Sequence, residues 1–305
     1  MNKITIGTSR LYASNIALGC MRMDSLTPAQ AAEVIQTSID AGIDFFDHAD
    51  IYGAGKSEEI FAAGLQKTGV SRDAIVLQSK CGIRKGVFDF SRQHIISSVE
   101  GSLRRLKTDY LDALLLHRPD TLFEPDEVAA AFDTLEKSGK VRYFGVSNQH
   151  PLQIELLKKS VRQPLIANQL QFSIMHTGMI DAGFNVNMTN ASAADRDGAI
   201  LEYSRLHDMT IQAWSPFQYG FFEGVFLDNE KFPELNAVID RIASQYQVKN
   251  TAIATAWILR HPANMQVIVG SMNPARIGDI ALASALRLSR DEWYEIYRAA
   301  GNVLP

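Results

Sequence analysis

Four polar side chains in the first part of the chain have the chemical types needed for proton transfer. Asp47, Tyr52, Lys80 and His117 lie at or just after the ends of short apolar runs, within FFDHADIYG, IVLQSKCG and LDALLLHRP. In a parallel α/β barrel the carboxyl ends of the strands carry the chemistry, whereas the opposite face mostly carries stability. The placement therefore predicts an acid, a phenol, an amine and an imidazole at one rim.

These four groups suit the protonation of an oxygen and include no obvious nucleophile. A tyrosine with a reference pKa of about 10 is a weak acid at neutral pH, and a neighbouring ammonium favours its phenolate. Lys80 is expected to supply that charge, Asp47 to hold Lys80 charged and oriented, and His117 to position a carbonyl oxygen. Because no side chain donates hydride, reduction of that carbonyl requires a bound nicotinamide cofactor.

The elements that would position these groups repeat along nearly the whole chain of 305 residues. Strand-like apolar runs alternate with longer amphipathic stretches, which predicts βα units and a mainly parallel sheet. Helix starts are expected at Thr27 with Pro28, at Ser91 and at Pro125. We predict an α/β fold, a single (β/α)8 TIM barrel forming one domain over residues 1–305, with strands at 16–18, 44–47, 75–79, 111–116, 141–146, 166–169, 210–213 and 266–269.

Two segments depart from this bare repeat. The opening KITIGTSRLYASNIALG predicts an N-terminal β-hairpin across the bottom of the barrel. The polar connection over residues 173–196 is far longer than the usual few-residue loop between strand and helix. Because it follows a strand at its carboxyl end, we expect it to overhang the rim near Tyr52 as a substrate-selecting lid, with His176 a candidate to touch substrate.

Composition narrows the classes of partner. The formal net charge is −4 and no block of Lys and Arg stands out, so neither nucleic acid nor an anionic membrane is an expected partner. Small molecules are expected instead. Only two cysteines occur, Cys20 and Cys81, which fits a reducing cytoplasm and indicates no disulfide framework. No stretch approaches the roughly 20 apolar residues of a membrane helix, and no secretory signal is expected.

Seven segments of the chain resemble the motifs of the aldo-keto reductase superfamily, in the order in which that family has them. The segments are FDHADIYG, SKCG, LLLHRPD, GVSN, NQLQFS, AWSP and GSMNPAR. The resemblance extends from LGCMRM to GSMNPARIGDI and so covers almost the whole chain. It implies an NADPH-dependent aldo/keto reductase of the alcohol dehydrogenase (NADP+) type, in which Asp47, Tyr52, Lys80 and His117 are the catalytic tetrad.

The resemblance also implies which residues hold the cofactor. The nicotinamide carboxamide would be bound by Ser147, Asn148 and Gln169, and the nicotinamide ring would stack on Trp214. The loop that wraps the pyrophosphate would contain Ser215, Pro216, Phe217, Gly220 and Phe221. The adenosine would be contacted by Gly270, Ser271, Arg276 and Asp279. A guanidinium suits bidentate phosphate binding, so Arg276 favours NADPH over NADH. Asp279 and Ile280 depart from the family pattern, because many members have a glutamate followed by an asparagine there to bind adenine.

Two other barrel chemistries use the same residues. His48, Asp50 and His117 are candidates to ligate a divalent metal for hydrolysis. Successive side chains along a strand face opposite ways, however, and His48 has no second histidine at a suitable spacing, so no metal site is expected. A Schiff base on Lys80 is a further alternative, but a neighbouring Asp47 fits a charged lysine better.

A third alternative is a protein that binds the cofactor but hardly catalyses reduction. Some proteins of this fold family bind NADPH and act as regulatory or redox-sensing subunits with negligible turnover, and the sequence leaves that role open. The substrate is also left open. Four apolar side chains in the expected rim loops, Met21, Met23, Phe88 and Phe90, indicate a partly hydrophobic carbonyl compound.

Overall fold

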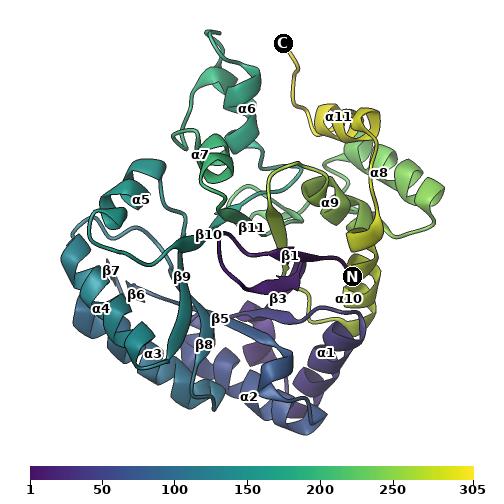
Figure 1. Cartoon of the computed structure of the whole chain (residues 1–305). Coiled ribbons are helices and arrows are strands. Elements are labelled where there is room, and N and C mark those ends of the chain that lie inside the picture. Colours follow the sequence, from purple (N-terminus) through teal and green to yellow (C-terminus); the bar gives the residue numbers. More distant parts are fainter.

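Eight parallel strands close into a barrel, the (β/α)8 fold predicted from the sequence (Figure 1). The computed structural model describes all 305 residues. Each barrel strand overlaps its expected range and differs from it by at most two residues at either end. The strands are β3 (Ile16–Gly19), β4 (Phe45–Asp47), β5 (Val76–Cys81), β8 (Leu111–Leu116), β9 (Val141–Ser147), β10 (Leu165–Gln171), β11 (Thr210–Trp214) and β14 (Met265–Val269).

Helices surround the barrel, and their starts follow the expected capping residues (Figure 1). The Thr27 side chain forms a capping box with Gln30, Ser91 accepts from the backbone N–H of His94, and Pro125 is the first residue of its helix. No helix is long and apolar enough to span a bilayer. The helices are α1 (Pro28–Asp40), α2 (Lys56–Thr68), α3 (Arg92–Leu106), α4 (Pro125–Lys137), α5 (Pro151–Lys158), α6 (Gly178–Phe184), α7 (Ile200–Leu206), α8 (Pro233–Tyr246), α9 (Asn250–Leu259), α10 (Pro274–Ala281) and α11 (Arg290–Ala299).

The predicted N-terminal hairpin, β1 (Lys3–Thr5) with β2 (Tyr12–Ser14), is present and closes the amino end of the barrel. Ile6, in the turn of this hairpin, is fully buried in an apolar cluster with side chains of the barrel strands. Gly7 has a φ of +56°, and a Cβ there would lie 2.3 Å from the Ile166 carbonyl oxygen, so only glycine fits this close approach. The bottom of the barrel is therefore filled.

Three smaller features decorate the carboxyl end of the barrel. Two short hairpins follow strands there, β6 (Ile83–Arg84) with β7 (Val87–Phe88), and β12 (Gln218–Tyr219) with β13 (Gly224–Val225). The long connection after β10 contains α6, which projects beyond the barrel together with α7 (Figure 1). The Tyr297 hydroxyl of α11 donates to Asp181 Oδ1 at 2.7 Å and ties α6 to the C-terminal helix.

Candidate active site

The ends of β4 and β5 bring a carboxylate and an ammonium together inside the barrel. Lys80 Nζ donates to Asp47 Oδ2 at 2.7 Å and to the His48 carbonyl oxygen at 2.9 Å. A third bond, of 3.1 Å, joins Lys80 Nζ to the Tyr52 hydroxyl. Asp47 is 1% exposed and Lys80 is fully buried. Three of the four expected catalytic residues thus form one continuous hydrogen-bonded chain.

His117, the fourth residue, lies on the other side of the phenol. It follows directly after β8, and its backbone N–H donates to the Cys81 carbonyl oxygen at 2.9 Å. Its ring is edge-on to Tyr52, with ring centroids 6.0 Å apart and an interplanar angle of 84°. Nδ1 is buried without a hydrogen-bond partner, which leaves Nε2 as the nitrogen that faces the cavity.

Burial is the largest single effect on the pKa of Tyr52, Lys80 and His117. It raises the pKa of Tyr52, and the opposing effect of Lys80 is not large enough to reverse that rise. Lys80 therefore acts in the expected direction without making the phenol a stronger acid than free tyrosine. Burial alone would lower the pKa of Lys80, but Asp47 and Tyr52 outweigh it and raise that pKa. Burial, helped by Lys80 and Arg118, lowers the pKa of His117 well below its ordinary value.

A cavity of about 790 Å³ opens above these residues at the carboxyl end of the barrel. Asp47, Tyr52 and His117 line it, whereas Lys80 lies beneath its wall. Of the cofactor residues expected from the sequence, two do not reach the cavity, Gly220 and Asp279. Those that line it are Ser147, Asn148, Gln169, Trp214, Ser215, Pro216, Phe217, Phe221, Gly270, Ser271 and Arg276.

Trp214, the last residue of β11, is held in place by side chains on several loops. Its Nε1 donates to Asn148 Oδ1 at 3.2 Å, and Asn148 Nδ2 in turn donates to Ser147 Oγ at 2.7 Å. Phe222 lies nearly parallel to the indole, with centroids 6.0 Å apart, and the Arg118 guanidinium lies 5.7 Å from its centroid. The indole is thus a fixed flat wall of the cavity.

The far end of the cavity is built by the loop after β14 and the first turn of α10. Asn273 caps α10 by accepting from the backbone N–H of Arg276 at 3.0 Å. The Gly270 carbonyl oxygen accepts from Arg22 at 3.1 Å, which ties this end to the loop after β3. Ile280 is fully buried in the core, so it does not face the cavity.

The structure provides no ligand set for the metal-hydrolase alternative. His48 is fully buried and lies edge-on to Phe61, with ring centroids 4.6 Å apart, and is not turned toward the rim. Burial, with Lys80 nearby, lowers the pKa of His48 to about 3. No group of three or more His, Cys, Asp or Glu side chains lies close enough to hold a metal ion.

Comparison with known proteins identifies the family of the chain. Residues 3–300 match the family model described as "Aldo/keto reductase family". The chain belongs to this family of oxidoreductases. The resemblance seen in the sequence is therefore confirmed. This aldo/keto reductase is also 34% identical over 314 residues to 6-dehydroglucose reductase from Agrobacterium fabrum, a match that covers 98% of each chain.

Solved structures of other aldo-keto reductases have the same fold as this chain. A thermostable aldo-keto reductase solved with the inhibitor epalrestat has a TM-score of 0.80 and 23% identity, and the match covers 98% of this chain and all of that one. An aldo-keto reductase from Klebsiella pneumoniae, solved with NADPH, has a TM-score of 0.78 and 24% identity, with 98% and 95% covered.

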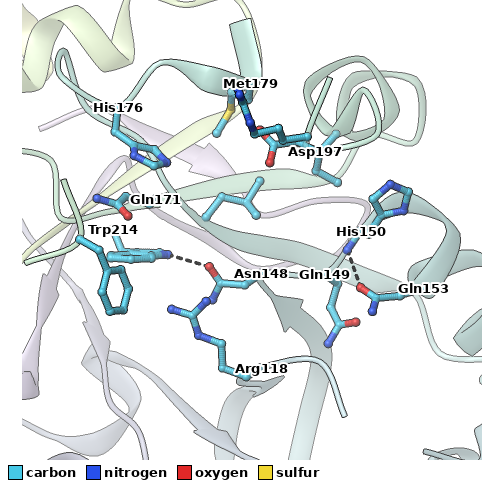
Figure 2. Close-up of a pocket in the computed structure, with 14 residues that line it drawn as sticks. Arg118, Asn148, Gln149, His150, Gln153, Gln171, His176, Met179, Asp197 and Trp214 are labelled. Atoms are coloured by element: carbon cyan, nitrogen blue, oxygen red, sulfur yellow. Dashed lines mark hydrogen bonds between the residues drawn. The ribbon is translucent and has the colours of Figure 1, made fainter. Parts of the chain in front are cut away.

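A smaller hollow of about 310 Å³, whose lining residues Figure 2 draws, shares part of its lining with the main cavity. Arg118, Asn148, Trp214 and Phe221 line both spaces, and Figure 2 shows Arg118 pointing toward Trp214. We call this smaller hollow the side chamber. Its other walls are mostly polar and come from the end of β10, from the connections after β9 and β10, and from α5, α6 and α7: Gln149, His150, Gln153, Leu170, Gln171, His176, Met179, Arg196, Asp197 and Ile200.

Sequence reasoning missed some cavity residues and chose others wrongly. Arg118 was missed although it directly follows His117, where a residue just past a strand end has to lie near the rim. Met23 and Phe90, expected in the substrate pocket, are 0% and 1% exposed in the core, so that expectation is wrong for both. Of the apolar rim residues named from the sequence, only Met21 lines the cavity.

Proposed function

We propose that this protein reduces an aldehyde or ketone to an alcohol with NADPH, and that Tyr52 donates the proton. The observation that carries the proposal is Tyr52 at the cavity wall, with its hydroxyl 3.1 Å from the buried Lys80 ammonium and its ring edge-on to that of His117. A phenol, a fixed positive charge and a second donor in one water-poor site suit the protonation of a carbonyl oxygen as negative charge develops on it.

The cavity fits a nicotinamide dinucleotide. Its lining includes Tyr52, the flat Trp214 ring and Arg276. Both amide protons of Gln169 are used on Asp47 and Gln212, which leaves its oxygen to accept from a carboxamide N–H. Bound NADPH would supply the hydride. The exposed guanidinium of Arg276 would bind the 2'-phosphate. We propose that the other cofactor residues predicted from the sequence, including Gly220 and Asp279, also bind the nucleotide.

The protein groups would divide the proton transfer between them. A tyrosine keeps its proton at neutral pH, and burial raises the pKa of Tyr52 further, so its proton is available for donation. The Lys80 ammonium would stabilise the phenolate left behind, while Asp47 keeps Lys80 charged and fixed. Neutral His117 would donate from Nε2 to the same carbonyl oxygen and hold it in line with Tyr52.

The side chamber supports a polar substrate in place of the partly hydrophobic one expected from the sequence. Its walls carry two arginines, two histidines and three glutamines, which suit hydroxyl or other oxygen-rich groups. The relative at 34% identity is named for a dehydro-sugar. We propose a hydroxylated small-molecule carbonyl compound, with residues 173–196 acting as the lid and with His176 near the substrate, in a cytoplasmic enzyme.

The first test is binding followed by turnover. Tryptophan fluorescence titrated with NADPH and NADH would measure cofactor affinity, and the absorbance of NADPH would then be followed with oxidised sugars and with apolar aldehydes. We expect tighter binding of NADPH and many turnovers, with higher kcat/KM for the hydroxylated compounds. Tight NADPH binding with negligible turnover would favour the regulatory or redox-sensing role, and no binding of either nucleotide would contradict the proposal.

A further inference from the structure

The barrel interior contains a layer of buried glutamines at the level of Asp47. Gln78, Gln169, Gln212 and Gln266 come from four different strands, and none is more than 3% exposed. The strand register aligns Asp47 with Gln78, and aligns Gln212 with Gln169 on one side and Gln266 on the other. Branched apolar side chains normally fill this part of a (β/α)8 barrel, so a polar layer is unusual.

Two of these glutamines hold the carboxylate directly. Asp47 Oδ1 accepts from Gln78 Nε2 at 2.7 Å and from Gln169 Nε2 at 3.1 Å. The other oxygen, Oδ2, accepts from Lys80 at 2.7 Å. Three donors from two strands therefore fix both oxygens of a carboxylate that has almost no access to water.

The remaining amides complete a network with a single orientation. Gln212 Oε1 accepts from Gln78 at 2.8 Å and from Gln169 at 3.1 Å. Gln212 Nε2 donates to Gln78 Oε1 at 3.1 Å and to Gln266 Oε1 at 2.9 Å, and Gln266 Nε2 donates to the Ser14 carbonyl oxygen at 2.7 Å. The carboxylate at one end and the backbone carbonyl at the other can only accept, so Gln78 and Gln169 must turn their Nε2 toward Asp47, and Gln266 must turn its Nε2 toward Ser14. Gln212, between them, then donates to the amide oxygens of Gln78 and Gln266.

A buried polar network lowers stability unless every donor and acceptor in it has a hydrogen-bond partner, and an apolar layer would fill the same space without this requirement. Its most direct consequence is geometric. Asp47 cannot tilt without breaking its hydrogen bonds from two glutamine amides, so Lys80 keeps its position between Asp47 and the Tyr52 hydroxyl. Gln78 contributes to this without lining the cavity, whereas Gln169 also lines the cavity wall.

We infer that Gln78 is a positioning residue, which fixes Asp47 and through it holds the Lys80 ammonium against the Tyr52 hydroxyl. Its effect on turnover rests on the function proposed above, but its effect on the ionisation of Tyr52 does not. The titratable or charged groups around the phenol are Lys80, Asp47, Cys20, His117 and Arg118. Gln78 acts through the first two.

The test replaces Gln78 by methionine, which has nearly the same length and no amide. The matched control is Gln266→Met, which removes an equally buried amide of the same layer that does not touch Asp47. For Gln78→Met we expect kcat to fall about tenfold, as for loss of a hydrogen bond to a charged group, with little change in KM. The alkaline inflection of kcat/KM should move upward by roughly half to one unit, because Lys80 pairs more closely with Asp47 and less with the phenol.

A second readout needs neither substrate nor cofactor. Ultraviolet difference titration of each protein against its own Tyr52→Phe counterpart isolates the ionisation of Tyr52 from that of the other tyrosines. In Gln78→Met the phenolate should form at higher pH than in the native chain, and in Gln266→Met at the same pH. This result would support the inference even if no carbonyl compound were reduced.

Two outcomes would overturn the inference. One is an unchanged Tyr52 titration and kcat in Gln78→Met, and the other is an equal change in both variants, which would show only the cost of removing a buried amide. If Gln78→Met fails to fold, Gln78→Asn gives the same test, because its shorter amide remains polar but does not reach Asp47. An unshifted Tyr52 titration in Gln78→Asn would likewise contradict a positioning role.

Discussion

Asp47 and Lys80 form an ion pair of 2.7 Å inside the barrel, where both side chains are almost completely shielded from water. A buried pair of this kind contributes little net stability, because removing both charges from water costs about as much as their attraction returns. Breaking the pair is a different matter, since it leaves one buried charge without a partner. The pair therefore makes the protein sensitive to the loss of either residue.

Lys80→Met should lower both stability and activity. The variant leaves Asp47 buried without a cation, and loss of one partner of a buried pair costs about 3–5 kcal/mol in the free energy of unfolding. Turnover should fall roughly 100-fold or more, because the phenolate of Tyr52 loses its counter-charge. Chemical denaturation and NADPH oxidation measure the two effects.

The double variant Asp47→Asn with Lys80→Met separates the two effects. Neither charge remains, so much of the lost stability should return, while activity should stay low because the cation beside Tyr52 is still absent. Recovery of activity together with stability would show that Lys80 acts only through folding.

Tyr52→Phe should remove most carbonyl reduction while leaving the dissociation constant of NADPH nearly unchanged. The phenol hydroxyl is the group facing the cavity beside Lys80, and loss of a positioned proton donor typically lowers the rate by about 10²–10⁴-fold. Steady-state kinetics and fluorescence titration give the two numbers. Tyr12→Phe, at an exposed tyrosine of the N-terminal hairpin, is the matched control, and a fully active Tyr52→Phe would remove Tyr52 as the donor.

The positions of the barrel strands could be predicted from the sequence because the βα period is strong and polar residues mark the strand ends. That pattern placed Asp47, Lys80 and His117 near one another, and the structure brings them together with Tyr52. It did not predict the direction of the pKa shift of Tyr52. That direction depends on whether burial or the Lys80 charge is the larger effect, and a sequence contains no measure of burial at one hydroxyl.

Part of the glutamine layer could have been predicted from the sequence. Gln78 lies two residues before Lys80, and Gln212 lies two before Trp214, so each shares a strand face with a residue at the site. Period-two spacing therefore places both amides inside the barrel, in the layer that also contains Asp47. Their hydrogen-bond partners depend on the register between strands that lie far apart in the chain, which the sequence does not show.

Arg276→Ala should weaken NADPH more than NADH. If the exposed guanidinium binds the 2'-phosphate, its loss should raise the NADPH dissociation constant about 10- to 100-fold, the size of a charge-assisted contact. The NADH constant should change little, because NADH has no 2'-phosphate. Arg290→Ala, an exposed arginine at the start of α11, is the control. Equal weakening of both nucleotides would contradict the phosphate role.

Asp50→Asn should stabilise the protein at neutral pH. Burial raises the pKa of Asp50 from 3.8 to about 6, although a hydrogen bond from Ser98 opposes the rise, and Asp50 Oδ1 is buried without a partner. Because the folded protein binds this proton more tightly than the unfolded chain, the contribution of Asp50 to stability is intact below pH about 4 and is lost as the pH rises to about 6.

The amide introduced at position 50 would carry no charge, so the variant should not show this loss. A shift of about two pKa units corresponds to at most about 3 kcal/mol, which is the expected upper limit of the gain at pH 7. The gain should become small near pH 4, where the native carboxyl is protonated in the folded state and partly protonated in the unfolded chain. Urea unfolding of both proteins between pH 4 and pH 8 measures this difference, with Asp240→Asn on the exposed side of α8 as the control. A gain that is the same at every pH would show that the effect is one of packing, not of charge.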